Sequence, residues 1–226
     1  MCGRYTHRLT WPEIVALYGL TESAGPPPGL EPRYNIAPTQ PAPVLRLGKN
    51  GREVVLMRWG LVPGWAKDPS IGNRLINARS ESAAEKPSFR GAMRARRCLV
   101  PASGFYEWQK LGKAKQPWWV GMAGGAPFSM AGLWESWRDP VAGDRLETFT
   151  ILTTAANALL APIHERMPVI VDPADYDAWL SGPGFAQLLR PHPTAGMAAH
   201  PVSSWVNSPA HDDPRCVEPV SLPTLA

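Results

Sequence analysis

Between residues 97 and 134, segments rich in β-branched and aromatic residues return roughly every ten residues, and this spacing restricts the fold more than any other feature. The segments read RCLVP, GFYEWQK, PWWVGM and FSMAGLW. Short strands at this spacing, separated by turn-forming residues, are typical of an antiparallel meander or a barrel. The centre of the chain is therefore expected to form a mostly antiparallel sheet.

Further strands and short helices are expected on both sides of this region. Residues 42–60 are typical of a hairpin, because two β-rich runs flank Asn50-Gly51, a pair suited to the positive φ angles of a tight turn. More strands are expected at 146–156 and 166–172. Helices are expected at 10–20, where Thr10 and Glu13 match a capping box, at 88–97, and after Asp172.

The length and this order of elements predict one α+β domain. With 226 residues, 44% of them hydrophobic, the chain is long enough to bury a sizeable core. We expect a single domain with a strongly curved, mostly antiparallel, barrel-like sheet flanked by short helices. This domain is expected over residues 1–205, with residues 206–226 as a loosely ordered C-terminal tail.

Composition excludes several classes of protein and leaves a polyanionic partner open. The net charge of +4 and the ten Trp residues are compatible with nucleic acid, whose bases stack on aromatic rings. Three scattered cysteines form neither a disulfide framework nor a zinc motif, so we expect no metal and no cofactor. With no signal peptide and no long apolar run, we expect a cytoplasmic monomer away from membranes.

The second residue offers two kinds of covalent chemistry. Removal of Met1 would leave Cys2 with a free α-amine and a thiol two carbons apart. A neutral amine attacks an aldehyde to give a Schiff base, which the neighbouring thiol can close to a thiazolidine. Alternatively, the thiol is a nucleophile with the amine as its base, as in amidohydrolases. On this residue alone, Cys2 could equally be a small buried side chain.

Other polar and aromatic residues could support such a site. Glu107, within GFYEWQK, is either solvated or buried in a pocket where its pKa would rise. His164 lies between two prolines in PIHERMP, and a lone histidine is more often structural than catalytic. Asn77 and Arg79 would share one face of an extended NARSES segment. Trp59 is expected in the core, and Trp65 either covers the core or stacks on a base.

Six motifs in order make the chain resemble the SOS-response-associated peptidase family, whose animal members were named as 5-hydroxymethylcytosine binders. The motifs are MCGRY, YNIAPTQ, WGLVPGW, NARSES, RRCLVPASGFYEW and IHERMPVIV. The resemblance implies binding of single-stranded DNA, with a preference for abasic sites. It also implies a covalent thiazolidine link between the abasic sugar and the N-terminal Cys2.

The resemblance also implies a role for each residue within these motifs. Asn77 would position Cys2, Glu107 would transfer protons, and His164 would assist in opening the sugar ring. The residues implied to bind DNA phosphates or bases are Arg4, Pro38, Trp65, Arg79 and Arg166. Small departures from the family pattern, Ser82, Ser103 and Glu165, affect none of the proposed reacting groups.

Two alternatives and one processing step remain open from sequence. Cys2 could serve a true peptidase or amidohydrolase, or the protein could bind modified single-stranded DNA without a covalent bond. Met1 is expected to be removed by the protein itself, which would satisfy the word "peptidase" without an external substrate, and removal by an aminopeptidase is the alternative.

Overall fold

Five strands close into a barrel at the centre of the computed structural model, which describes residues 2–21 and 25–222. The barrel order is β10–β4–β3–β6–β9, and a further pairing of β9 with β10 closes the ring. All these contacts are antiparallel except the parallel pairing of β10 with β4. The strands are β3 (Pro41–Gly48), β4 (Gly51–Trp59), β6 (Arg97–Ala102), β9 (Phe128–Arg138) and β10 (Arg145–Ala155).

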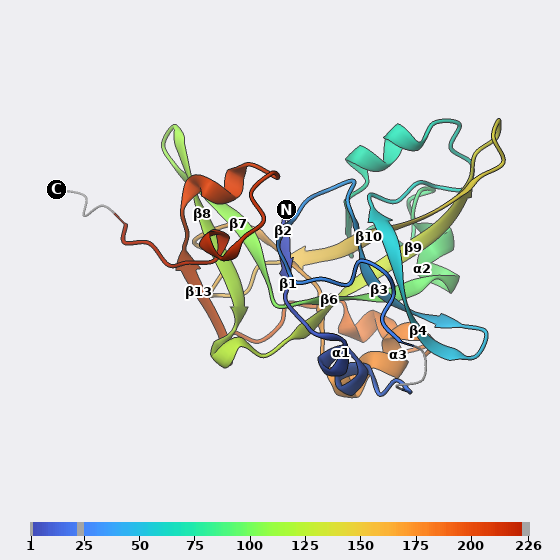
Figure 1. The fold of residues 1–226 in the computed structure, drawn as a ribbon, viewed down its shortest axis with the longest axis horizontal. Coiled ribbons are helices and arrows are strands. Elements are labelled where there is room, and N and C mark those ends of the chain that lie inside the picture. The colour runs from blue at the N-terminus through green and yellow to red at the C-terminus, as the bar shows by residue number, and fades with distance from the viewer. Residues whose placement is uncertain (1, 22–24, 223–226) are drawn as a thin grey trace.

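A second, five-stranded sheet stands beside the barrel (Figure 1). Its order is β13–β8–β7–β1–β2, and all its pairings are antiparallel. The strands are β1 (Tyr5–His7), β2 (Arg33–Ile36), β7 (Gly104–Leu111), β8 (Ala114–Met122) and β13 (Met197–Pro201). The expected α+β class and the curved, mostly antiparallel sheet are therefore confirmed.

Short strands and helices complete the fold. The strands β5 (Asn77–Arg79) and β11 (Arg166–Pro168) pair with β10, and β12 (Ile170–Val171) pairs with β9. The α-helices are α1 (Trp11–Tyr18), α2 (Arg90–Ala95) and α3 (Tyr176–Leu180). The 3₁₀ helices are η2 (Pro69–Arg74), η3 (Ala123–Gly125), η4 (Pro173–Asp175), η5 (Phe185–Leu188), η6 (Ser204–Asn207) and η7 (Pro214–Cys216).

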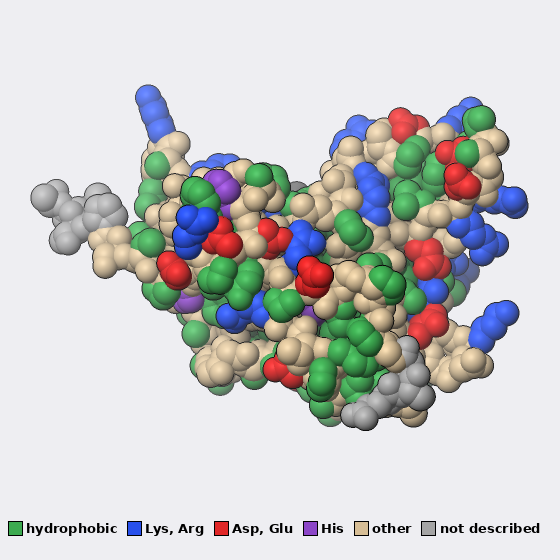
Figure 2. All heavy atoms as spheres, viewed as in Figure 1, with side chains coloured by type: hydrophobic (Ala, Val, Ile, Leu, Met, Phe, Trp, Pro, Cys, Tyr) green, Lys and Arg blue, Asp and Glu red, His purple; other side chains and the backbone are tan. Residues whose placement is uncertain are grey.

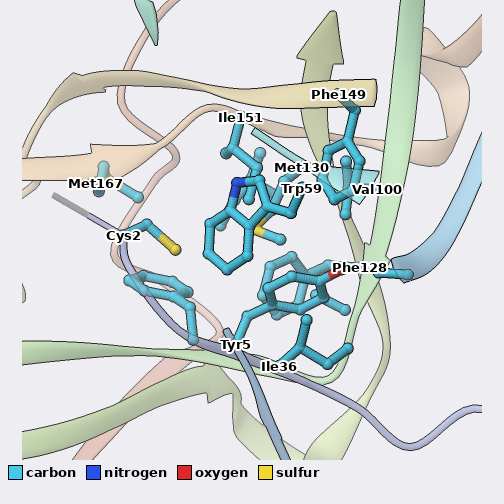
Figure 3. Packing of buried hydrophobic residues seen from close by; sticks show 14 of the residues in the cluster. Cys2, Tyr5, Ile36, Trp59, Val100, Phe128, Met130, Phe149, Ile151 and Met167 are labelled. Carbon is cyan, nitrogen blue, oxygen red and sulfur yellow. The ribbon is translucent and has the colours of Figure 1, made fainter. Parts of the chain in front are cut away.

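The alternation of side chains along the barrel strands separates two cores. Every strand of the ring contributes to an inner cluster, at whose centre the indole of Trp59 is fully buried, as expected (Figure 3). Its ring stacks on Phe149 and meets Tyr5 edge-on, and its N–H donates to the Ile76 carbonyl at 2.8 Å. The opposite strand faces form an outer cluster with residues of α1, α2 and α3.

The sequence correctly predicted the start of α1, but it placed the turn of the β3–β4 hairpin one residue too late. Thr10 and Glu13 form the expected capping box at the start of α1. In the β3–β4 hairpin, Gly48 pairs with Gly51, so the turn residues are Lys49 and Asn50 rather than Asn50-Gly51. Gly51 still takes the positive φ, 112°, which favours glycine.

The expectation of a loosely ordered tail from residue 206 onward is wrong for the described part, which ends at residue 222. Val206 and Cys216 are buried, and η6 and η7 contact each other. The Asp212 carboxylate accepts hydrogen bonds from the main-chain N–H groups of Tyr34 and Asn35. Long-range contacts of this kind leave no local pattern in a proline-rich sequence. We call residues 203–217 the C-terminal strap.

No helix in the described ranges is both long and apolar enough to cross a membrane.

Seen from the side used in Figures 1 and 2, the upper edge of the molecule is hollowed between the β7–β8 side and the side that carries η2. The N-terminal end of the chain lies at the base of this hollow (Figure 1).

The buried imidazole of His7 should make the fold sensitive to acid. Its side chain is fully buried, neither ring nitrogen has a hydrogen-bond partner among the described residues, and burial lowers its pKa to about 4. Because the unfolded chain takes up a proton near pH 6.5, stability is lost as the pH falls from there toward 4. Between pH 7 and pH 5 the free energy of unfolding should fall by about 2 kcal/mol through this group.

Urea unfolding of the wild type and of His7→Leu at both pH values tests this prediction. The variant should lose about 2 kcal/mol less on acidification. His192→Gln, whose ring faces the Asp172 carboxylate, is the matched control and should keep the acid loss. An equal acid loss in His7→Leu would show that other groups cause it.

Candidate functional site

Four chain segments bring the predicted reacting residues to one place. Cys2 directly precedes β1, Asn77 opens β5, Glu107 lies in β7, and His164 precedes β11. The register of β1 on β7 pairs Tyr5 with Phe105, which carries the start of the chain toward Glu107. The strands β5 and β11 both pair with β10, which brings the other two residues to the same end of the barrel.

The Cys2 thiol is buried at the edge of the inner core. Its side chain has no exposed surface and lies near Tyr5 and Met167 (Figure 3). The sulfur donates a long hydrogen bond to the Arg4 carbonyl, with Sγ and O 3.7 Å apart. Burial, helped by the nearby Glu107 carboxylate, raises the pKa of the thiol far above its usual value. The sulfur is therefore a neutral thiol at physiological pH.

Asn77 holds the main chain at Cys2. Its Nδ2 donates to the Cys2 carbonyl oxygen at 2.7 Å. The side-chain oxygen Oδ1 is buried and accepts no hydrogen bond from any described residue. The side chain thus fixes Cys2 with its donor end and leaves an acceptor for a ligand.

Glu107 and His164 lie next to each other, with Glu107 close to Cys2. The Glu107 side chain is about 1% exposed, and burial raises the pKa of its carboxyl to about 7. The Nε2 of His164 lies 4.0 Å from Oε2 of Glu107. The main-chain N–H of Arg166 donates to His164 Nδ1 at 3.0 Å, so a neutral ring carries its proton on Nε2. Burial lowers the pKa of His164, which favours that neutral form.

The three predicted phosphate-binding arginines differ in how they are held. The Arg4 guanidinium donates to Asn35 Oδ1 and to the carbonyl oxygens of Val206 and Asn207. The Arg166 guanidinium makes a two-pronged pair with Glu81, at 2.7 and 2.8 Å, and also donates to the Thr153 carbonyl. Arg79, in contrast, is exposed on β5. Arg79 is therefore the most accessible of the three cations.

The predicted base-contacting residues lie in two different loops. Pro38 is half-buried and precedes Thr39, whose φ of 74° is unusual for a β-branched residue. The N–H of Thr39 donates to the Trp59 carbonyl at 2.8 Å, which holds this strained turn in place. Trp65 is about 60% exposed and lines a cavity that includes none of Cys2, Asn77, Glu107 or His164.

Sequence reasoning missed the partners that hold these side chains. Asn35 is fully buried, and its amide donates to the carbonyls of Val206, Ser208 and His211 while its oxygen accepts from Arg4. In the sequence, the position of Asn35 within the YNIAPTQ motif was the only indication that this residue matters for the site. Nothing local identified Glu81 as the partner of Arg166, because 85 residues separate the two.

The described residues include no group of three or more His, Cys, Asp or Glu side chains placed to hold a metal ion. The arrangement instead supplies a thiol, an amide, a carboxyl with a pKa near neutrality and a neutral imidazole. Such a set can hold and move protons at a carbonyl or an aldehyde.

Comparisons with known proteins match this chain over most of its length. The family model of SOS response associated peptidase (SRAP) matches residues 1–209. The chain is 40% identical to the abasic site processing protein YoqW of Bacillus subtilis, over 96% of this chain and 99% of that one. It is 35% identical to the abasic site processing protein HMCES of Gallus gallus, over 84% and 67%. A crystal structure from Bacteroides thetaiotaomicron has a TM-score of 0.85 and 28% identity, covering 97% and 100%.

The raised pKa of Glu107 should make the fold less stable at alkaline pH. The unfolded chain releases this proton near pH 4.5 and the folded chain near pH 7. Stability from this group is therefore full below pH 4.5 and is lost as the pH rises through 7. Between pH 5 and pH 8 the free energy of unfolding should fall by about 2 kcal/mol.

Glu107→Gln should remove most of this loss and be more stable than the wild type at pH 8, as measured by urea unfolding. The matched control is Glu165→Gln, an exposed carboxylate close by in sequence, which should unfold with the wild-type pH dependence. If Glu107→Gln were less stable than the wild type at pH 8, the carboxylate would be held by favourable contacts instead.

Proposed function

Because the chain belongs to the SOS response associated peptidase family, we propose that it captures abasic sites in single-stranded DNA as covalent adducts of Cys2. The curated relatives at 40% and 35% identity carry the name abasic site processing protein. The observation that carries the proposal is the hydrogen bond from Asn77 to the Cys2 carbonyl beside the pair of Glu107 and His164. This arrangement would set the amine and thiol of a processed Cys2 beside two groups that are able to transfer protons.

The reaction begins when removal of Met1, which lies outside the described residues, frees the Cys2 amine. An abasic sugar is mostly a closed hemiacetal. As it opens to the aldehyde, the Nε2–H of His164 gives a proton to the ring oxygen, the Glu107 carboxylate takes the proton of the anomeric hydroxyl, and Glu107 then returns a proton to His164. The amine adds to the aldehyde carbon, and loss of one water gives an imine. The Cys2 sulfur then adds to the imine carbon, its proton passes to the nitrogen, and the thiazolidine ring closes.

Glu107 suits the proton transfers between these steps. With a pKa of about 7, it is present in both protonation states at neutral pH and can both accept and donate a proton. The thiol must lose its proton as it attacks, since burial keeps it neutral until then. A nearby carboxylate can carry that proton to the imine nitrogen.

The buried thiol also favours lesion capture over hydrolysis of external peptides. A cysteine peptidase needs a thiolate, which forms where a positive environment lowers the thiol pKa. Here burial raises the pKa of Cys2. Release of Met1 by the protein itself would be a single event that exposes the amine.

Arg4, Arg79 and Arg166 would contact phosphates of the captured strand, with Pro38 against a neighbouring base. Contacts of this kind give affinity without sequence preference, because every nucleotide carries the same phosphate. Arg4 is positioned by Asn35 before DNA arrives, whereas the guanidinium of Arg166 is paired with the Glu81 carboxylate. A strand bound in the hollow of Figure 2 would pass over the N-terminal end of the chain.

The decisive experiment is incubation of the processed protein with single-stranded DNA that contains one abasic site. The wild type should form an adduct that survives denaturing electrophoresis, with a mass equal to protein plus DNA minus one water. Cys2→Ala and Cys2→Ser both keep the amine but lack the thiol that closes the ring. Neither should form an adduct that survives denaturation unless the imine is trapped with borohydride.

Cys98→Ala is the matched control, since Cys98 is also buried in the inner core but belongs to β6. It should form adducts like the wild type. A denaturation-stable adduct with Cys2→Ala at the wild-type rate would exclude the thiazolidine. Retained binding without any adduct in the wild type would favour the non-covalent alternative.

The Glu81 carboxylate should compete with DNA for Arg166. Glu81 holds both terminal nitrogens of that guanidinium, and its own side chain is about half exposed. Glu81→Gln should therefore bind undamaged single-stranded DNA about two- to fivefold more tightly in a low-salt titration, the range of one exposed ion pair. Glu85→Gln, an exposed carboxylate in the same segment, should change affinity less. Weaker binding by Glu81→Gln would mean that the carboxylate positions Arg166 rather than blocking it.

A further inference from the structure

The two side chains that would transfer protons come from different sheets. Glu107 lies on β7 of the second sheet, whereas His164 lies in the loop that joins β10 to β11 of the sheet that contains the barrel. This loop, residues 156–165, is closed at its base, where the Ala156 N–H donates to the Glu165 carbonyl at 3.0 Å. That bond shapes the loop but does not set its distance from β7. Contacts between the loop and the second sheet therefore decide how far apart the two side chains lie.

Gln109 makes such a contact. It follows Glu107 by two residues on β7, so both side chains project from the same face of the sheet. Its Nε2 donates to the Pro162 carbonyl oxygen, two residues before His164, at 3.1 Å. The proline ring fixes φ at this residue, so the carbonyl is carried by a backbone with little freedom. The hydrogen bond thus connects the strand of Glu107 to the loop of His164, two residues from each.

Trp118 holds the Gln109 amide in the orientation that this contact requires. It lies directly opposite Glu107 on β8, so its side chain projects from the same face. The indole N–H of Trp118 donates to Gln109 Oε1 at 3.1 Å. An indole is only a donor, so it meets the oxygen of the amide and leaves the NH₂ group for the Pro162 carbonyl. Because β8 pairs with both β7 and β13, the main chain at Trp118 is fixed on both sides.

We propose that Gln109 is a positioning residue that holds His164 against Glu107. The Nε2 of His164 lies 4.0 Å from Oε2 of Glu107, about 1 Å beyond the range in which a proton is transferred directly. A misplacement of about 1 Å can cost about a hundredfold in rate, so movement of the loop away from β7 would remove the step in which His164 acts. The proposal rests on lesion capture, in which that step is the opening of the closed sugar.

Gln116 offers a matched comparison on the same sheet. It pairs with Gln109 across β7 and β8, and its amide donates to the carbonyl of Val202, directly after β13, at 2.9 Å. Both glutamines connect the sheet to a neighbouring segment, and it is Gln109 that reaches the loop of His164. Replacing either by methionine removes the amide and keeps the length of the side chain.

Single-turnover adduct formation on two substrates tests the proposal. One is a single strand with an abasic site, whose sugar must open, and the other carries an acyclic aldehyde in its place. Gln109→Met should lower the maximal rate on the abasic strand by between about tenfold and a hundredfold, with the half-saturating DNA concentration unchanged. On the acyclic aldehyde it should react like the wild type, since no ring oxygen has to be protonated. Gln116→Met should match the wild type on both substrates.

Two further variants show whether Gln109 acts through His164. On the abasic strand, Gln109→Met/His164→Ala should be no slower than His164→Ala alone, because both residues serve one step. Trp118→Phe keeps an aromatic ring without the N–H donor, and it should show a smaller loss than Gln109→Met with the same substrate pattern. Equal slowing of both substrates by Gln109→Met, or further slowing in the double variant, would overturn the proposal.

Amide hydrogen exchange without DNA separates this proposal from the function on which it rests. Exchange within residues 156–165 should be faster in Gln109→Met than in the wild type, and unchanged in Gln116→Met. If the wild type forms adducts while Gln109→Met reacts and exchanges like the wild type, the role of Gln109 is refuted and lesion capture stands. If the wild type forms no adduct but the loop exchanges faster in Gln109→Met, lesion capture fails and Gln109 stands as the residue that holds His164 in place.

Discussion

The strand β10 exchanges main-chain hydrogen bonds with β9, β4, β5 and β11, and these ladders hold the barrel and the site together. The pairing with β9 closes the barrel around Trp59. Further along the same strand, Ile151 pairs with Asn77 and Ala155 with Arg166. Any shift in the register of β10 would therefore move the site and disturb the core at once.

Burial sets the chemical character of the site. It raises the pKa of the Cys2 thiol and of Glu107, and it lowers the pKa of His164. In each case burial favours the neutral form of the side chain over its charged form, because a charge is poorly stabilised away from water. The charged groups stand around this neutral centre, and Arg4 and Arg166 are held there by partners of their own. The arrangement would separate the proposed proton transfer inside from the proposed phosphate binding outside.

How far the sequence predicted the structure depends on how local each interaction is. The capping box of α1 and the strand spacing from residue 97 are local, and both were correct. The motifs that brought Asn77 and Glu107 forward carry family information, and the fold puts them near Cys2. Asn35 and the C-terminal strap were missed, because the bonds between them connect residues more than 170 positions apart. Such bonds depend on the whole fold and have no counterpart in local propensity.

The hydrogen bond between the Arg4 guanidinium and the Val206 carbonyl affects the order in which parts of the chain fold during synthesis. It joins residues 202 positions apart, and the loop that it closes spans most of the chain. Contacts of such long separation form late, because the entropy of closing the loop must be overcome first. While the protein is being synthesised, β1 therefore lacks this anchor until the strap has left the ribosome. The segment that carries Cys2 is thus made long before the strap and is fixed by this bond only after the strap has been made.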